Sequence, residues 1–88
     1  MSLQDTMTDK LTAAFAPTML EVLDESENHR GHGGWREGGE THFRVRIVSA
    51  AFAGKSRVER HRMVNQVLDA ELKGRVHALA METKAPGE

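Results

Sequence analysis

Cysteine is absent from this 88-residue chain, and its absence removes several kinds of chemistry. Without a thiol there is no disulfide, no cysteine nucleophile and no thiolate ligand for a metal. This composition is typical of a reducing compartment, so we expect a cytoplasmic protein. Tyrosine is also absent, and the aromatic side chains are only Phe15, Phe43, Phe52 and Trp35. The core is therefore expected to be mainly aliphatic.

Long apolar runs are missing too. No stretch reaches the roughly 18 apolar residues that a membrane-spanning helix needs. Residues 1–10 are polar and acidic, unlike the basic and then apolar start of a signal peptide. We expect no membrane association. A chain of this length cannot be divided between two self-sufficient cores, so residues 1–88 are predicted to form a single domain.

Signatures of catalysis are lacking as well. The sequence has no phosphate-binding loop and no supported Ser/His/Asp arrangement. Asp24, Glu25 and Glu27 form an acidic cluster, but they lie at a predicted strand end and in a loop, where solvation accounts for them. We predict that the protein is not an enzyme and works by binding partners.

Apolar residues recur at helical spacing near the N-terminus. They are Leu3, Met7, Leu11, Ala14 and Phe15. Ser2 is a suitable N-cap for this helix, and Pro17 prevents its continuation. Farther along the chain, Ser56 and Glu59 have the spacing of a capping box that opens one long helix ending at Gly74. That helix is expected to bury Val64, Val67, Leu68 and Leu72, with Gly74 in the left-handed conformation.

Alternating patterns predict three short strands, at residues 20–24, 42–48 and 76–83. In the second strand Phe43, Val45 and Ile47 share one face, and in the third His77, Leu79 and Met81 do. Residues 49–53 are expected to form a helical turn that ends at Gly54.

Residues 25–41 hold five of the eight glycines, and a loop of this length is usually functional. We expect residues 84–88 to form a flexible tail. A long helix between the last two strands makes those strands parallel. The sequence therefore predicts an α+β fold, in which a three-stranded mixed sheet has its helices packed on one face.

Charge is unevenly distributed, although the formal net charge is −1. Acidic side chains outnumber basic ones in residues 1–29, and the reverse holds in residues 30–62. Such segregation favours an anionic partner, either protein or nucleic acid, and the alternative is a solvated surface without a partner. The basic residues at the start of the long helix are Lys55, Arg57, Arg60 and Arg62, and Arg44 and Arg46 on the second strand are expected to extend this patch.

Several segments of the chain resemble the BolA-like family. They are Asp24-Glu25-Ser26, Thr41-His42-Phe43, Val48-Ser49, Phe52-Ala53-Gly54, Arg60-His61-Arg62-Met63-Val64 and Val76-His77-Ala78-Leu79-Ala80. The resemblance spans roughly residues 8–86. It implies an αββααβ fold of the class II KH type. It also implies pairing with a monothiol glutaredoxin in iron–sulfur cluster assembly or iron homeostasis, and some bacterial members are described as transcriptional regulators of stress and morphology responses.

A [2Fe-2S] cluster needs four ligands, and imidazole can replace thiolate on one iron. A chain without cysteine can therefore hold such a cluster only together with a partner. The resemblance implies a glutaredoxin and its bound glutathione as the source of sulfur, and it places His77 at the main ligand position. The alternative for His77 is a buried histidine hydrogen-bonded within the sheet.

The resemblance places the second ligand in the glycine-rich loop, at His29. His32 can take its place, although an exposed loop histidine is the better interpretation for His32. His42 can approach the same site across the sheet, but we favour a structural or surface role for it. His61 is interpreted as a helix-packing residue.

The second hypothesis is a DNA-binding transcriptional regulator that uses the basic helix of residues 55–62. The Gly-x-x-Gly loop with which KH domains bind single strands is incomplete here, because the corresponding stretch is Ala53-Gly54-Lys55-Ser56. Trp35 stands alone as a candidate stacking platform. Sequence-specific RNA recognition is therefore disfavoured. In isolation we expect a monomer or a weak homodimer.

Overall fold

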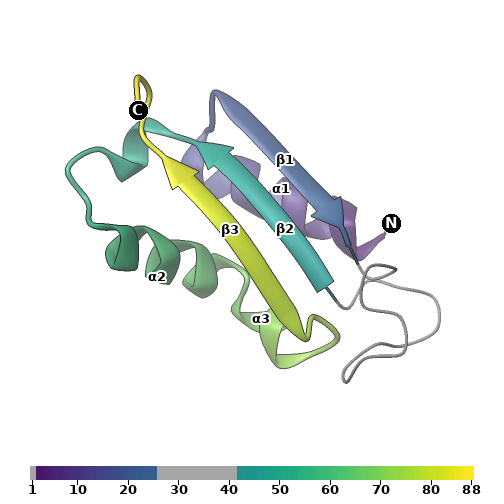
Figure 1. Cartoon of the computed structure of the whole chain (residues 1–88). Helices are drawn as coiled ribbons and strands as arrows, with labels where there is room; N and C mark the ends of the chain where they lie inside the picture. The colour runs from purple at the N-terminus through teal and green to yellow at the C-terminus, as the bar shows by residue number, and fades with distance from the viewer. Residues whose placement is uncertain (1, 26–41) are drawn as a thin grey trace.

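A computed structural model of the protein describes residues 2–25 and 42–88. Its elements are α1 (Leu3–Phe15), β1 (Met19–Asp24), β2 (His42–Val48), η2 (Ala50–Phe52), α2 (Arg57–Val67), α3 (Asp69–Lys73) and β3 (Ala78–Lys84). Figure 1 shows the three strands side by side, with α1 behind them and α2 alongside β3. The predicted α+β fold with a three-stranded mixed sheet is confirmed.

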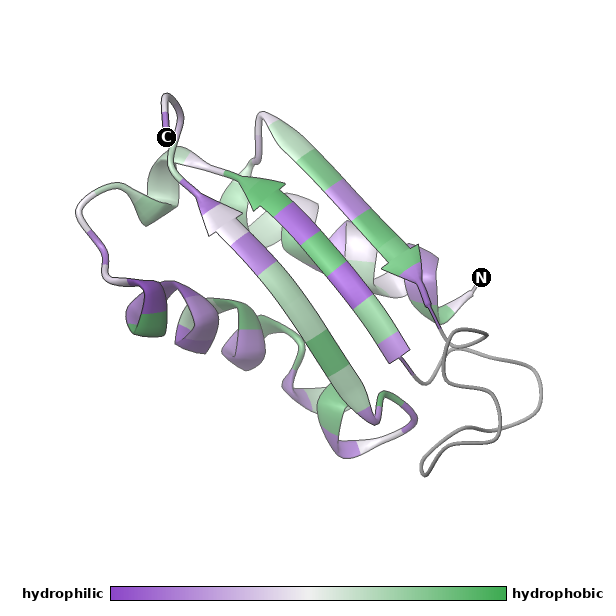
Figure 2. Cartoon of the chain, viewed as in Figure 1, coloured by the Kyte–Doolittle hydropathy of each residue, from purple (hydrophilic) through white to green (hydrophobic). Residues whose placement is uncertain are grey.

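The central strand of the sheet is β2. It pairs antiparallel with β1 and parallel with β3, so that Val45 lies opposite Val22 on one side and Met81 on the other. Phe43, Val45 and Ile47 are buried, as predicted, and they join the core residues of the helices in one cluster. Apolar and polar residues alternate along β2 (Figure 2), so Arg44 and Arg46 lie on the opposite face of the sheet. That face also carries the exposed side chains of Met19 and Leu23 from β1.

The first helix follows its sequence signals closely. The Ser2 hydroxyl accepts a hydrogen bond from the Asp5 N–H at 3.1 Å, which confirms the predicted N-cap. Ala16 ends the helix in the left-handed region, with φ at 43°, directly before Pro17. Ala14 was predicted on the buried stripe but is exposed. The buried stripe is narrower than predicted and consists of Met7, Leu11 and Phe15.

The long second helix is interrupted, contrary to the prediction. Its start is as expected, because the capping box of Ser56 and Glu59 is present. At Leu68, however, φ and ψ are −100° and 18°, and the helix divides into α2 and α3. The bend lets Leu68 stay buried while Glu71 turns inward to an ion pair with Lys10.

The turn between α3 and β3 also differs from the prediction. Gly74 has φ at −101°, so it is not a left-handed cap. A Cβ at this position would lie 3.3 Å from the Ala70 carbonyl oxygen, and this close approach accounts for the glycine. The strand begins at Ala78 rather than at Val76, because Val76 is buried in the turn and donates its N–H to the Glu71 carbonyl.

Residues 84–88, expected as a flexible tail, are joined to the fold by several contacts. Lys84 is the last residue of β3, and Ala85 is buried. The Glu88 carboxylate accepts a hydrogen bond from the Ala85 N–H and two more from the Arg60 guanidinium. Within residues 2–25 and 42–88, no helix combines the length and apolar character that crossing a membrane would require.

Candidate functional site

Two histidines meet at one end of the sheet. His42 is the first residue of β2, and His77 directly precedes β3. The parallel register places His42 opposite Ala78, so the two imidazoles lie side by side, with ring centroids 5.5 Å apart and planes inclined by 58°. A ring nitrogen coordinates a metal ion at about 2 Å, so rings at this spacing can share one metal centre after small rotations.

The two rings differ in exposure. His77 is exposed, so the alternative of a buried histidine within the sheet is wrong. His42 is only 5% exposed, which agrees with the structural role expected for it and not with the surface role. Its backbone is held by the Glu25 N–H, which donates to the His42 carbonyl oxygen at 2.8 Å. The pair therefore combines one fixed, buried imidazole with one accessible imidazole.

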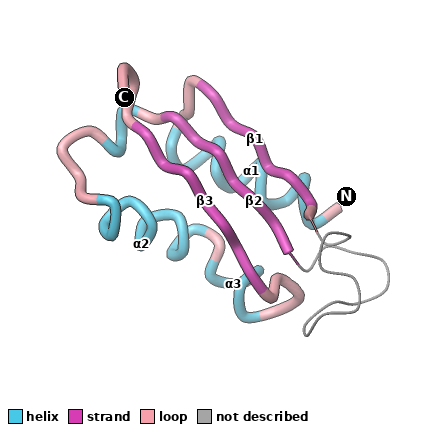
Figure 3. The backbone as a smooth tube through the Cα atoms, viewed as in Figure 1, coloured by secondary structure: helices cyan, strands magenta, loops and turns pink. Residues whose placement is uncertain are grey.

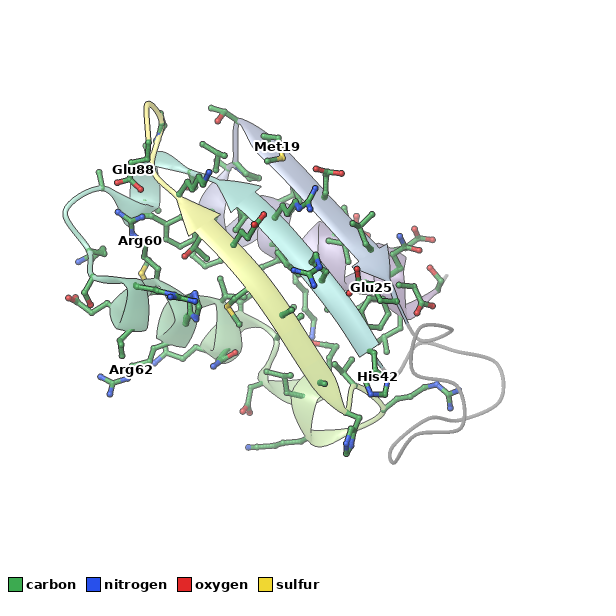
Figure 4. All side chains as sticks on the ribbon, viewed as in Figure 1. Met19, Glu25, His42, Arg60, Arg62 and Glu88 are labelled. Atoms are coloured by element: carbon green, nitrogen blue, oxygen red, sulfur yellow. The ribbon has the colours of Figure 1, made fainter. Side chains whose placement is uncertain are left out.

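A shallow depression of about 260 Å³ adjoins His42, the buried member of the histidine pair. It is lined by Glu25, His42, Phe43, Arg44, Ala78, Leu79 and Ala80. Arg44 donates from Nε to the Glu25 carboxylate at 3.1 Å, so the charges at this site compensate each other. Figure 4 shows His42 and Glu25 at the same end of the molecule. The depression can accept a small side chain or ligand group next to the imidazoles.

Residues 2–25 and 42–88 contain no group of three or more potential metal-ligating side chains. Two imidazoles are fewer than the four ligands of an iron–sulfur cluster. His29 and His32 lie outside the described residues, and the choice between them as a ligand stays a prediction. On the described residues alone, this site fits a metal centre only if a second molecule supplies further ligands.

The cationic residues do not form the single patch that the sequence predicts. Arg44 and Arg46 alternate with the buried residues of β2 and so lie on the face of the sheet away from the helices. Each contacts carboxylates there. The Arg46 guanidinium lies 3.0 Å from the Glu82 carboxylate and 3.9 Å from that of Glu21. These arginines therefore belong to a charge-balanced sheet face rather than to the basic surface of α2.

Arg60 was predicted to bind a partner, and the structure gives it a structural role. Its side chain is only 11% exposed. It donates to the Thr83 carbonyl oxygen at 3.2 Å, and its two terminal nitrogens reach the Glu88 carboxylate at 2.5 and 2.7 Å. The hydrogen bonds between Arg60 and Glu88 raise the pKa of Arg60 and, with the Ala85 N–H, lower the pKa of Glu88 to about 2.

The exposed cations of the predicted patch are Lys55, Arg57 and Arg62. They surround the start of α2, where the hydrogen bonds from Ser56 lower the pKa of Glu59 and nearby Lys55 and Arg62 add to the effect. His61 was interpreted as a packing residue only. It lines, with Arg57, a depression of about 190 Å³ between α2 and β3. The four-residue spacing of Arg57 and His61 on one helix face was the available signal.

Comparison with known proteins is consistent across sequence and structure. The family profile described as BolA-like protein matches residues 11–88. An uncharacterized Sinorhizobium protein from the cobS 5′ region is 56% identical over 89 residues, covering 100% of this chain and 96% of that protein. The DNA-binding transcriptional regulator BolA of Escherichia coli is 43% identical, covering 94% of this chain and 75% of the regulator.

A solved structure agrees as well. The BolA domain of SufE1 from Arabidopsis thaliana superimposes with a TM-score of 0.88 and is 45% identical. The alignment covers 98% of this chain and 94% of that domain. The match extends over the whole sheet and the helices behind it, so the similarity is that of an entire domain.

Proposed function

This chain belongs to the BolA-like protein family, and from that premise we propose that it pairs with a monothiol glutaredoxin and shares or transfers a [2Fe-2S] cluster. The protein then acts as an accessory factor without catalytic activity of its own. The observation that carries this proposal is the side-by-side placement of His42 and His77. Imidazole nitrogen is an accepted ligand of [2Fe-2S] iron, and the chain has no cysteine to compete with it.

The cluster is the cargo of the pair and needs sulfur ligands from the partner. His77 is exposed and can reach a cluster held by a second protein. His42 is fixed by its strand and supports His77 or supplies a second nitrogen. The adjoining depression admits part of the partner, such as a glutathione group. Replacing thiolate with imidazole on one iron raises the reduction potential and makes the shared cluster distinct from one held by thiolates alone.

This proposal is tested with the purified complex. The chain and a monothiol glutaredoxin are reconstituted with iron, sulfide and glutathione, and the absorption and circular dichroism spectra are recorded. We expect His77→Ala to change the spectrum to that of the glutaredoxin cluster alone. His61→Ala is the matched control, because His61 lies on α2 and is expected to leave the spectrum unchanged. Identical spectra for wild type and His77→Ala would contradict the assignment of His77 as a ligand.

A second function, DNA binding by a transcriptional regulator, is supported by the exposed cations of α2. Lys55, Arg57 and Arg62 lie close together in the chain at the helix start. In the Arg57→Ala variant, we expect the slope of log affinity against log salt to fall by about 1, since one phosphate contact is lost. Arg44→Ala is the control, because Arg44 lies on the face of the sheet away from the helices and contacts Glu25. Fluorescence anisotropy with promoter fragments measures the slope, and no binding at low salt would rule this function out.

A further inference from the structure

An ion pair joins the first helix to α3, the short helix that precedes the turn carrying His77. The Lys10 ammonium lies 2.7 Å from the Glu71 carboxylate, and the two residues are 61 positions apart in the sequence. Glu71 is only 8% exposed. Carboxylates are seldom buried to this degree unless they are paired, so the pair is a specific tertiary contact between α1 and α3.

Glu71 also anchors the turn through its backbone. Its carbonyl oxygen accepts hydrogen bonds from the Gly74 N–H at 3.2 Å and from the Val76 N–H at 3.1 Å. Val76 is buried, and the next residue is His77. The side chain of Glu71 therefore holds α3 against α1, while its main chain fixes the start of the segment that presents the imidazole.

The short helix α3 depends on such a tether. It has five residues and no side-chain N-cap, and a helix of this length is not stable by itself. Its other ion pair, between Lys73 and Asp69, is internal to the helix and exposed, so it does not fix α3 to the rest of the fold. Lys10, by contrast, lies on a helix that is anchored in the core. Met7 and Leu11, three residues before it and one after it on α1, are both fully buried. Figure 1 shows α3 at the end of the sheet where β3 begins.

We propose that Lys10 and Glu71 are positioning residues for His77: the ion pair holds the α3–β3 turn so that the His77 imidazole stays beside His42. The role in cluster binding rests on the proposed function, whereas the positioning itself does not. Without the Lys10 charge, the Glu71 carboxylate is buried with no cation, and its Oε1 atom has no hydrogen-bond partner among the described residues. The carboxylate gains solvation if α3 shifts outward, and the turn and His77 move with it.

The test uses Lys10→Met, which keeps an unbranched side chain one atom shorter than that of lysine and removes the charge. Two signals are followed by nuclear magnetic resonance in the free protein: the Overhauser contact between the His42 and His77 rings, and amide exchange at Val76. We expect the ring contact to weaken and exchange at Val76 to accelerate by about tenfold relative to Val45, since Lys10 is partly exposed and water takes over part of its role. Val45 lies on the central strand and reports global unfolding, so the ratio isolates the local effect.

Two further variants make the test specific. Lys10→Arg retains the charge, and we expect its ring contact and its Val76 exchange rate to match those of the wild type. Lys73→Met removes the exposed pair of the same helix and is expected to leave both unchanged. The proposal is overturned if Lys10→Met leaves the ring contact and the Val76 to Val45 ratio as in the wild type, or if Lys73→Met has the same effect as Lys10→Met.

Reconstitution with the glutaredoxin separates this inference from the proposed function. If Lys10→Met displaces His77 and also alters the spectrum of the shared cluster, both the positioning role and the ligand role are supported. If Lys10→Met displaces His77 while the cluster spectrum stays that of the wild type, the positioning role stands and the ligand assignment of His77 fails.

Discussion

The backbone positions of His42 and His77 set what each imidazole can do. His42 lies inside a strand, with its carbonyl oxygen bonded to Glu25, and its ring is buried. His77 lies in the turn before β3, where no strand pairing constrains it, and its ring is exposed. A burial difference of this kind cannot be derived from residue identity, because both histidines precede an alternating apolar pattern in the sequence.

The contact between Arg60 and Glu88 makes stability depend on pH in the acid range. The hydrogen bonds from the Arg60 guanidinium lower the pKa of Glu88 from 4.5 to about 2. A carboxyl group whose pKa is lower in the folded state stabilises the fold fully above its unfolded pKa, and that contribution is lost as the pH falls through the folded pKa. The stabilisation is therefore present above pH 4.5 and disappears toward pH 2.

Glu88→Gln removes this titration. We expect the variant to be less stable than the wild type at pH 6 and to lose less stability between pH 4.5 and pH 2. Urea unfolding followed by circular dichroism at several pH values measures the difference. Parallel stability curves for the two proteins across this interval would show that the contact does not form in solution.

At the scale of the elements, local signals in the sequence predict where helices begin better than where they end. Ser2 and the Ser56–Glu59 capping box mark the starts of α1 and α2, because an N-cap depends on residues within one turn. The break at Leu68 was not predictable in this way, since no glycine or proline marks it in the sequence. The strand β2 is predictable for a similar reason, because its alternation of apolar and polar residues is also a local pattern.

The candidate site was predictable only in part. The family resemblance indicated His77 as a ligand. Its neighbour His42 follows only from the sheet register, and its exposure only from the structure. The predicted basic patch is too large, since the alternation of β2 places Arg44 and Arg46 opposite the apolar face on which the helices pack. Figure 3 shows α1 behind the strands and α2 alongside β3.

The turn before α2 depends on a glycine conformation. Gly54 has φ at 74°, and a Cβ there would meet no atom within 4 Å, so space does not limit a substitution. The left-handed conformation alone sets the cost, which we expect to be about 1–2 kcal/mol for Gly54→Ala. Gly54→Asn should cost less, because Asn adopts this conformation more readily. Denaturant unfolding measures both, and a Gly54→Ala protein as stable as the wild type would contradict the role of this glycine.

At the scale of the whole molecule, the histidine pair and the C-terminal contacts occupy opposite ends of the sheet. Figure 4 shows His42 at one end, and Arg60 with Glu88 at the other. The exposed cations Arg57 and Arg62 lie on α2, away from the sheet face on which Arg44 and Arg46 contact their carboxylates. A partner bound at the histidines and an anion bound at α2 would therefore use separate surfaces, so cluster sharing and DNA binding are independently testable.

The central claim is that this chain supplies an imidazole ligand to a cluster shared with a glutaredoxin. The most direct measurement labels only the histidines of this chain with ¹⁵N and records electron–nuclear double resonance spectra of the reduced complex. We predict strongly coupled nitrogen signals that change with the label and are lost in His77→Ala. A spectrum that shows no nitrogen coupling from the labelled chain would contradict the account.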